Sequence, residues 1–308
     1  MNTLTPTAAP FPSTLISEFE TLLASLYTRP KKIQDAVESI DASAFERKHY
    51  TSPALFLDQR LFRLFQPRTT ADSSRLRGAA IAALCLRLPQ RIEALRLPDC
   101  ILSLYPRTLN MIFRHLALEL EHAYPTPTCD FFLKDARIVT ALSVPCGAQY
   151  VDLKGAVRLR SLLKHAAFTG QTSPLRQLAT TSMLASWFEI HTDPRDLDDF
   201  NEPGWDRCYG NIAQLLANNP SVAGMVGTSW FYDPQLIEIS PRIAYLQRTP
   251  IRGGALQIRN GPAPIHTERA TSKSDTRRRL YQEGKYLPVC YTIIWPREKL
   301  LAWFRSKH

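Results

Sequence analysis

Residues 186–232 read SWFEIHTDPRDLDDFNEPGWDRCYGNIAQLLANNPSVAGMVGTSWFY. We expect a strand over 186–191, a helix over about 204–218 and a second strand over 222–232, because β-rich runs flank a segment with helical apolar spacing. A strand, a helix and a strand in succession are typical of a sheet with helices packed on its faces. This alternation places the chain in the α/β or α+β class.

The alternation extends on both sides of this stretch. Before it, two neighbouring strands are expected over 131–144 and 148–153, around a turn at Pro145, Cys146 and Gly147. The other expected elements are helices over 155–166, 173–184, 276–283 and 298–305, strands over 254–259 and 287–295, and a helical or irregular segment over 234–246.

The N-terminal part has a different pattern. Apolar residues recur at helical spacing from Leu15 to Leu26, and further helices are expected over 53–66, 74–88 and 107–123. The expected organisation is a flexible Thr/Pro/Ala-rich N-terminus (1–13), a helical region (14–125) and an α/β domain (126–308). The α/β domain would contain a mixed sheet with helices packed on it and a basic C-terminal segment.

Composition excludes several classes of protein. The chain has 308 residues, 44% hydrophobic and 21% charged, so it can bury a core. Its apolar runs, such as Ala79–Leu86, are shorter than the roughly 20 residues of a membrane span. Six cysteines without a C-x-x-C pair, and no export signal, favour a reduced, cytoplasmic protein. P-loop, dinucleotide-binding, G-x-S-x-G and H-E-x-x-H motifs are absent.

The positive charge is concentrated near the C-terminus. The formal net charge is +10, and residues 251–308 hold 12 Lys/Arg against 4 Asp/Glu. A basic field of this kind attracts phosphates, nucleotides or nucleic acid. An unspecific, positively charged surface is the alternative explanation.

One candidate site consists of His191, Asp193 and His266. His-x-Asp places two ligands on one side of an extended chain, and Arg277 or Arg278 follows the second histidine. This pattern resembles the Fe(II)/2-oxoglutarate-dependent oxygenases. The resemblance implies that the three residues bind iron and that an arginine holds the co-substrate 2-oxoglutarate. The alternative is a simple turn at Asp193-Pro194.

A second candidate site lies in residues 270–289, ATSKSDTRRRLYQEGKYLPV. The N-terminus of its helix and Arg277, Arg278 and Arg279 could hold the phosphates of a cofactor. Leu280-Tyr281, followed by Gly284 and Tyr286, resembles the late helix of the GNAT N-acetyltransferase superfamily. The resemblance implies an acyl-CoA cofactor and Tyr281 as the general acid for the leaving thiolate. The alternative is an amphipathic helix with Leu280 and Tyr281 anchored in the core.

Three functional hypotheses follow. The first is an acyltransferase-like enzyme that uses acyl-CoA, or a similar phosphate-bearing donor, on a small amine. The second is an iron oxygenase with His191, Asp193 and His266 as ligands. The third is a non-enzymatic protein that binds anions or nucleic acid. The organisation of the C-terminal half favours the acyltransferase.

Overall fold

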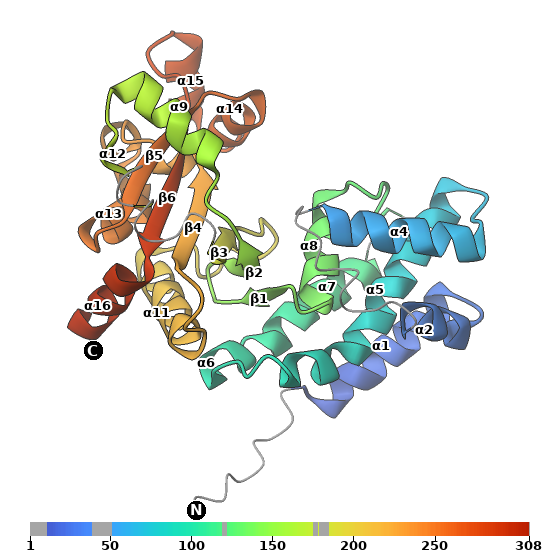
Figure 1. Ribbon diagram of the computed structural model, residues 1–308. Coiled ribbons are helices and arrows are strands. Elements are labelled where there is room, and N and C mark those ends of the chain that lie inside the picture. The colour runs from blue at the N-terminus through green and yellow to red at the C-terminus, as the bar shows by residue number, and fades with distance from the viewer. Residues whose placement is uncertain (1–10, 39–50, 119–121, 175–177, 179–184, 308) are drawn as a thin grey trace, which may run out of the picture. The chain divides into compact units, whose positions relative to one another are not determined.

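The computed structural model describes residues 11–38, 51–118, 122–174, 178 and 185–307 (Figure 1). The chain divides into two units, Met1–Pro145 with Asp193–Asp196, and Cys146–Thr192 with Leu197–His308. The first unit is helical, and the second is built on a mixed sheet with helices packed on it, which confirms the expected fold class. No helix in the described ranges combines the length and the apolar character needed to cross a bilayer.

The first unit is organised around α5. Ala79–Leu84 are buried on every side of this helix, as in a helix surrounded by others. A capping box of Thr69 and Asp72 begins α5. The helix continues past Pro89, where the sequence predicts a break, and the buried Leu88 and Ile92 stabilise its last turns. The other helices are α1 (Ser13–Leu26), α2 (Pro30–Glu38), α4 (Ser52–Phe65), α6 (Asp99–Leu102), α7 (Tyr105–Leu118) and α8 (Asp130–Val139), beside α5 (Thr70–Glu93).

The strand expected over 131–144 is wrong for most of its length. Residues Asp130–Val139 form α8, and only Ser143–Pro145 form a strand, β1. The segment contains charged residues, and its buried Phe132, Ala136 and Val139 recur at i, i+4 and i+7, the spacing of one helix face. The Lys134–Asp130 ion pair, at i,i+4 spacing, stabilises the helix. Because α8 packs on α4 and α5, the first unit extends beyond residue 125 to Pro145.

A buried ionic cluster lies in the first unit. The guanidinium of Arg195 donates to both oxygens of Asp135, at 3.0 and 2.6 Å, and to Asp193 Oδ2 at 2.7 Å. Tyr124 Oη donates to Asp135 Oδ2 at 2.5 Å. The ring of Phe131 lies 4.5 Å from the guanidinium carbon. The core of the first unit therefore includes a segment, residues 193–196, that follows the third strand of the chain.

The sheet of the second unit contains the strands β2 to β6 in the spatial order β2-β3-β4-β6-β5. β3 and β4 are parallel and are connected through α11, while the other neighbouring strands in this order are antiparallel. The strands are β2 (Tyr150–Gly155), β3 (Trp187–His191), β4 (Gly224–Ser229), β5 (Leu256–Gly261) and β6 (Cys290–Pro296). The helices are α9 (Leu159–Thr169), α11 (Glu202–Asn218), α12 (Leu236–Ile239), α13 (Tyr245–Arg252), α14 (Pro264–Thr271), α15 (Asp275–Gln282) and α16 (Arg297–Lys307), with 3-10 turns at Trp230–Tyr232 and Pro241–Ile243.

These elements confirm the strand–helix–strand prediction for residues 186–232, with the second strand ending at Ser229 in a 3-10 turn. The predicted strands at 254–259 and 287–295 and the two late helices are also present, with small shifts of their ends. Most of the helix predicted over 173–184, and residues 1–10 of the predicted flexible N-terminus, lie outside the described residues.

The two faces of the sheet are distinguished by the alternation of side chains along its strands. On one face, Val226 and Ile294 belong to an apolar cluster that Leu162 of α9 completes. On the other face, the Trp295 ring packs 5.2 Å from Tyr209 of α11 and 5.2 Å from Trp303 of α16. The sheet is therefore covered on both faces, and α9 forms part of one cover (Figure 1).

Candidate ligand-binding site on the sheet

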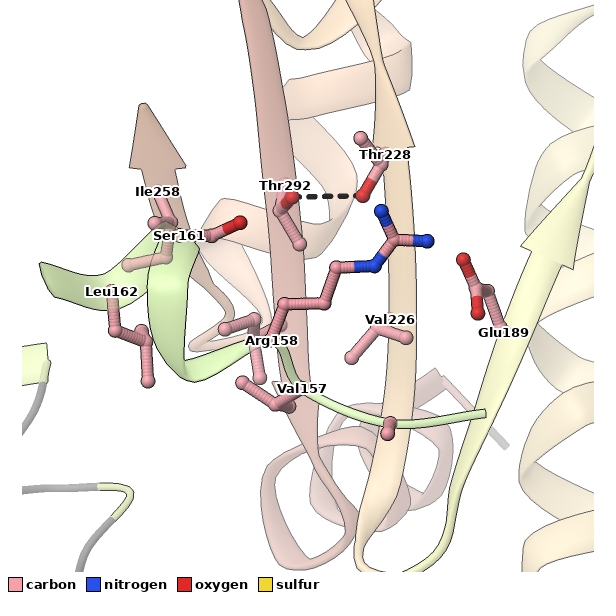
Figure 2. A pocket seen from close by; sticks show the side chains of 11 residues that line it. Val157, Arg158, Ser161, Leu162, Glu189, Val226, Thr228, Ile258 and Thr292 are labelled. Atoms are coloured by element: carbon pink, nitrogen blue, oxygen red, sulfur yellow. Dashed lines mark hydrogen bonds between the residues drawn. The ribbon is translucent and has the colours of Figure 1, made fainter. Parts of the chain in front are cut away.

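A pocket lies on the α9 face of the sheet, between the beginning of α9 and the strands β3, β4 and β6. Its cavity measures about 20 Å³, which is room for about one water molecule, and it opens to solvent. We call it the sheet-face pocket, and Figure 2 shows the side chains that line it. They are Ala156, Val157, Arg158, Ser161, Leu162, Glu189, Val226, Thr228, Ile258, Thr292 and Ile294.

The strand register brings the lining residues together. Glu189 of β3 pairs with Val226 of β4, and Val226 pairs with Ile294 of β6. Two residues further along, Thr228 pairs with Thr292. Because paired residues in adjacent strands point to the same face, all five side chains face α9. The pocket is thus built by pairing between segments that are up to about a hundred residues apart.

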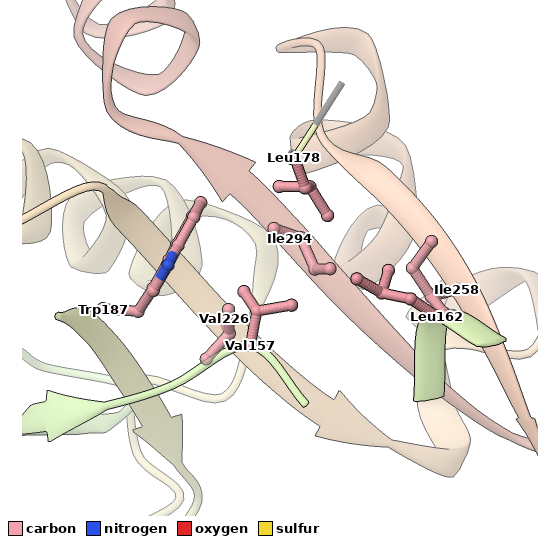
Figure 3. Packing of buried hydrophobic residues seen from close by; sticks show 7 residues of the cluster. All are labelled: Val157, Leu162, Leu178, Trp187, Val226, Ile258 and Ile294. Atoms are coloured by element: carbon pink, nitrogen blue, oxygen red, sulfur yellow. The ribbon is translucent and has the colours of Figure 1, made fainter. Parts of the chain in front are cut away.

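The floor of the pocket is apolar. Val226, Ile258 and Ile294 are each at most 3% exposed and form one cluster with Leu162 and Trp187 (Figure 3). Burial of this cluster fixes the backbone beneath the polar side chains that line the pocket. A rigid floor of this kind favours binding, because little conformational entropy is lost when a ligand is bound.

The polar wall includes a hydrogen-bonded chain. Asn260 Nδ2 donates to Thr292 Oγ1 at 2.8 Å, and the hydroxyls of Thr292 and Thr228 are 2.8 Å apart. Asn260 therefore occupies one lone pair of Thr292 and restricts how the two hydroxyls can turn. Thr228 is exposed, so its hydroxyl is accessible to a ligand in the pocket.

Two opposite charges line the same pocket. Arg158 immediately precedes α9 and is exposed, and Glu189 in the middle of β3 is half-buried. Figure 2 shows the Arg158 side chain extending across the pocket toward Thr228 and Glu189. Within the described part of the chain, neither of the two side chains forms an ion pair. Both charges are available to a ligand.

Cys290 precedes the pocket residues Thr292 and Ile294 on the same face of β6. Burial raises the pKa of its thiol to about 11, although the hydrogen bond from Asn260 and the charge of Arg158 lower it. The thiol is therefore protonated near neutral pH and does not act as a nucleophile. Glu189 is the carboxylate among the residues that line the pocket.

The three arginines of α15 do not share one environment. Arg277 is buried: its Nε donates to the Ala270 carbonyl at 2.5 Å, its Nη1 donates to Ser240 Oγ at 3.0 Å, and its guanidinium lies over the Trp230 ring. Burial lowers the pKa of Arg277. Arg277 is thus part of the packing of the second unit.

Arg278 and Arg279 lie on the surface of the same helix. Arg278 pairs with Asp275 at 3.2 Å, and Arg279 approaches Glu283 at 3.9 Å. Ser274 caps the helix by accepting a hydrogen bond from the Arg277 amide. The positive charge of α15 is therefore partly compensated by its own carboxylates.

Tyr281 lies on the exposed side of α15 and is 42% exposed. The alternative interpretation, that Tyr281 is anchored in the core, is wrong, and Tyr286, which is 2% exposed, is the buried tyrosine of this segment. Tyr281 lines an open hollow beside α14, with Glu268 among the other lining residues. This hollow is distinct from the sheet-face pocket, and no residue lines both.

Two of the three proposed iron ligands, His191 and Asp193, have other partners. His191 Nε2 lies 3.0 Å from Asp152 Oδ2. Asp193, in the first unit, accepts hydrogen bonds from Arg195 on both carboxylate oxygens. His266 belongs to the second unit, where burial, with the nearby charge of Arg269, lowers its pKa. Among the described residues, no group of three His, Cys, Asp or Glu side chains could hold a metal ion.

The chain has no match among protein-family models, curated proteins or solved structures. Its functional assignment therefore depends on the chemistry of the sheet-face pocket. The sequence reasoning missed Arg158, Glu189, Thr228 and Thr292. Among these residues, Glu189 is the one that the sequence could have indicated, because it is a charged residue between apolar neighbours in a predicted strand. A carboxylate at such a position usually has an ionic partner or a functional role.

Proposed function

We propose that the second unit is an acyltransferase-like enzyme that transfers an acyl group from acyl-CoA, or a similar phosphate-bearing donor, to a small amine whose nitrogen enters the sheet-face pocket. The observation that carries this proposal is the half-buried Glu189 carboxylate, which lines the pocket without an ion-pair partner among the described residues. A protonated amine must lose a proton before it can attack an acyl carbon, and a carboxylate within hydrogen-bond reach can accept that proton.

The position of the pocket in the sheet supports a role in binding. The pairing of β3 with β4 ends at Ile190 and Gly227, whereas β4 remains paired with β6 as far as Ser229. Ligands of α/β sheets bind at the carboxyl ends of neighbouring parallel strands. Thr228, which lines the pocket, lies at this end of β4.

In the proposed reaction, the amine nitrogen attacks the carbonyl carbon of the thioester. A C–N bond forms, the C–S bond breaks, and Glu189 accepts the proton that the nitrogen loses. The hydroxyl of Thr228 is an available donor for the carbonyl oxygen as it gains negative charge. The GNAT resemblance gives Tyr281 the role of protonating the released thiolate, and this role stays a prediction. Because Tyr281 lines a separate hollow, the thiolate released at the sheet-face pocket takes its proton from water.

The phosphates of the donor require cationic partners. Arg278 and Arg279 are exposed and remain candidates for this role, while Arg277 is occupied by contacts within the second unit. These arginines would supply charge for holding the donor and would take no part in proton transfer.

The test is the release of free thiol from acetyl-CoA in the presence of a panel of small amines. We expect wild-type protein to release thiol with at least one amine, and Glu189→Gln to lower kcat/KM by about 10²- to 10⁴-fold. Glu238→Gln, at an exposed carboxylate of α12 outside the pocket, is the matched control and should retain the full rate. Tyr281→Phe tests the general acid separately.

Two outcomes would show that the proposal is wrong. One is that the wild-type protein releases no thiol with any amine of the panel. The other is that Glu189→Gln retains the wild-type rate while circular dichroism shows both proteins to be folded.

A further inference from the structure

We infer that the outer side of α9 is a docking surface for membranes that contain anionic lipid. This inference goes beyond the proposed function and does not depend on it. It is carried by exposed apolar side chains that lie beside exposed cations on one helix, in a stretch of the chain without carboxylates. We call this surface the α9 face, and it consists of Leu159, Arg160, Leu163, Lys164, Ala167 and Phe168.

The inner side of α9 is fixed on the sheet. Leu162 is 1% exposed and belongs to the apolar cluster of the sheet. His165 is 6% exposed, and its Nδ1 accepts a hydrogen bond from the Arg259 amide of β5 at 3.1 Å. Figure 1 shows α9 lying across the sheet. Because successive residues of a helix are about 100° apart, the α9 face points away from the strands and is held in a defined orientation.

The apolar part of the α9 face forms a row along the helix. Leu159, Leu163 and Ala167 follow one another at i, i+4 and i+8, and the two leucines are 47% and 53% exposed. Phe168, in the last turn, is 65% exposed. Neighbouring large apolar side chains that face water on one helix are a feature of helices that lie in a membrane interface.

The basic part of the α9 face lies next to this row. Arg160 and Lys164, at i and i+4, are exposed, and within the described residues they form no ion pair. Like charges at this spacing repel each other, so an anionic partner would stabilise the helix. Residues 153–188 contain five Lys/Arg and no Asp or Glu, so the charge of this segment is not neutralised along the chain.

An anionic bilayer is complementary to both parts of the α9 face. Its phosphates attract the cations, and its acyl-chain boundary accepts the apolar side chains. Nucleic acid would satisfy Arg160 and Lys164 but would leave the leucines in water, because its bases stack mainly on aromatic rings. The aromatic ring of this face, Phe168, already has the Arg259 guanidinium 3.7 Å from its centre.

The test is co-sedimentation of the full chain with lipid vesicles. Vesicles of phosphatidylcholine alone are compared with vesicles that also contain phosphatidylglycerol. We expect the partition coefficient to be at least about tenfold higher for the anionic vesicles, because each Lys or Arg near such a surface adds to the affinity. This preference should decrease when the salt concentration is raised from 0.01 M to about 0.5 M, since salt screens the attraction.

Two double variants test the charges. Arg160→Gln combined with Lys164→Gln should lower the partition coefficient on anionic vesicles about 25-fold, or about fivefold for each cation. The matched control is Lys299→Gln combined with Arg305→Gln, at two exposed cations of α16. This control changes the net charge by the same amount and should bind like the wild type.

Two single variants test the apolar row. Leu163→Gln should lower the partition coefficient about tenfold or more, because a leucine side chain no longer enters the apolar boundary. Ile237→Gln, on α12, is the control, since this side chain is 45% exposed and lies outside the α9 face. Circular dichroism shows whether each variant is folded, and the salt dependence of the wild type tests the role of charge without any substitution.

Four results would overturn the inference. The first is equal binding of the wild type to both kinds of vesicle, or no binding to either. The second is an equal loss in the two double variants, which would make the net charge and not the α9 face responsible. The third is binding of duplex DNA or single-stranded RNA without binding of vesicles. The fourth is a dimer, measured by analytical ultracentrifugation, that Leu163→Gln dissociates, because a second copy would then cover this face.

Discussion

Replacing Arg195 with methionine is expected to destabilise the first unit strongly. The substitution removes the cation from between Asp135 and Asp193, whose side chains are both 0% exposed. Breaking a buried ion pair on one side costs about 3–5 kcal/mol, because a charge is left without compensation. With a urea dependence of about 2 kcal/mol/M, the unfolding midpoint would fall by about 1.5–2.5 M.

The two units can be followed separately, because all five tryptophans (187, 205, 230, 295 and 303) lie in the second unit. Circular dichroism at 222 nm reports helices of both units, whereas tryptophan fluorescence reports the second. Arg195→Met should therefore add an early transition to the circular dichroism curve that fluorescence does not show. Arg114→Met, at an exposed arginine of α7, is the control and should unfold like the wild type.

The pH dependence of the unfolding free energy provides a second test of this prediction. Burial raises the pKa of Asp193, but the hydrogen bonds and charge of Arg195 outweigh it, so this pKa lies below the usual value. The pair therefore stabilises the wild type above the unfolded pKa of about 3.9, and this contribution is lost as the pH falls through the folded pKa. In Arg195→Met, the Asp193 carboxyl would lack the cation and its pKa would rise, because burial would no longer be outweighed.

The destabilisation of Arg195→Met should therefore be largest near pH 7 and smaller at pH 4.5. If the free energy of unfolding of Arg195→Met at pH 7 lies within about 0.5 kcal/mol of the wild-type value, which is the range of ordinary surface substitutions, the reasoning is refuted. A loss of unfolding free energy that is the same at pH 7 and at pH 4.5 would show that packing, and not charge, is the cause.

Two further predictions concern the second unit. Arg277→Met should lower the stability of this unit by about 1–3 kcal/mol, because the buried Ala270 carbonyl loses its hydrogen-bond donor. Tryptophan fluorescence during urea unfolding measures this loss. The control is Arg279→Met, at a side chain that is 70% exposed, and it should unfold like the wild type. Gly253→Ala should also destabilise this unit, by about 1–3 kcal/mol, since its Cβ would lie 2.2 Å from Trp295 Cζ2; an unchanged midpoint would contradict that packing.

Periodicity predicts the order of elements because local spacing is what separates a helix from a strand. The stripe from Leu15 to Leu26 and the segment 204–218 have one clear period, and both are helices. The segment 131–139 also has helical spacing, with Phe132, Ala136 and Val139 buried on one face, and the prediction of a strand overlooked this signal.

The candidate site was harder to predict, because it depends on register and not on local sequence. Arg158 and Glu189 are 31 positions apart and line one pocket because β2, which precedes Arg158, pairs with β3. For the three consecutive arginines of α15, the sequence predicts one cluster of charge that the fold does not form. Successive residues on a helix point about 100° apart, so a run of like residues does not act as one cluster. Here one arginine packs inward and two face solvent.

The buried ionic cluster of the first unit also affects how the chain can fold during its synthesis. Asp135 precedes Arg195 by 60 residues. At about 5–20 residues per second, the ribosome would deliver the arginine roughly 3–12 s after the aspartate. During that interval, the Asp135 carboxylate of α8 lacks the guanidinium of Arg195, so water must solvate it. We expect the helices of the first unit to associate early on the ribosome, and to reach their final packing only after the third strand has been synthesised.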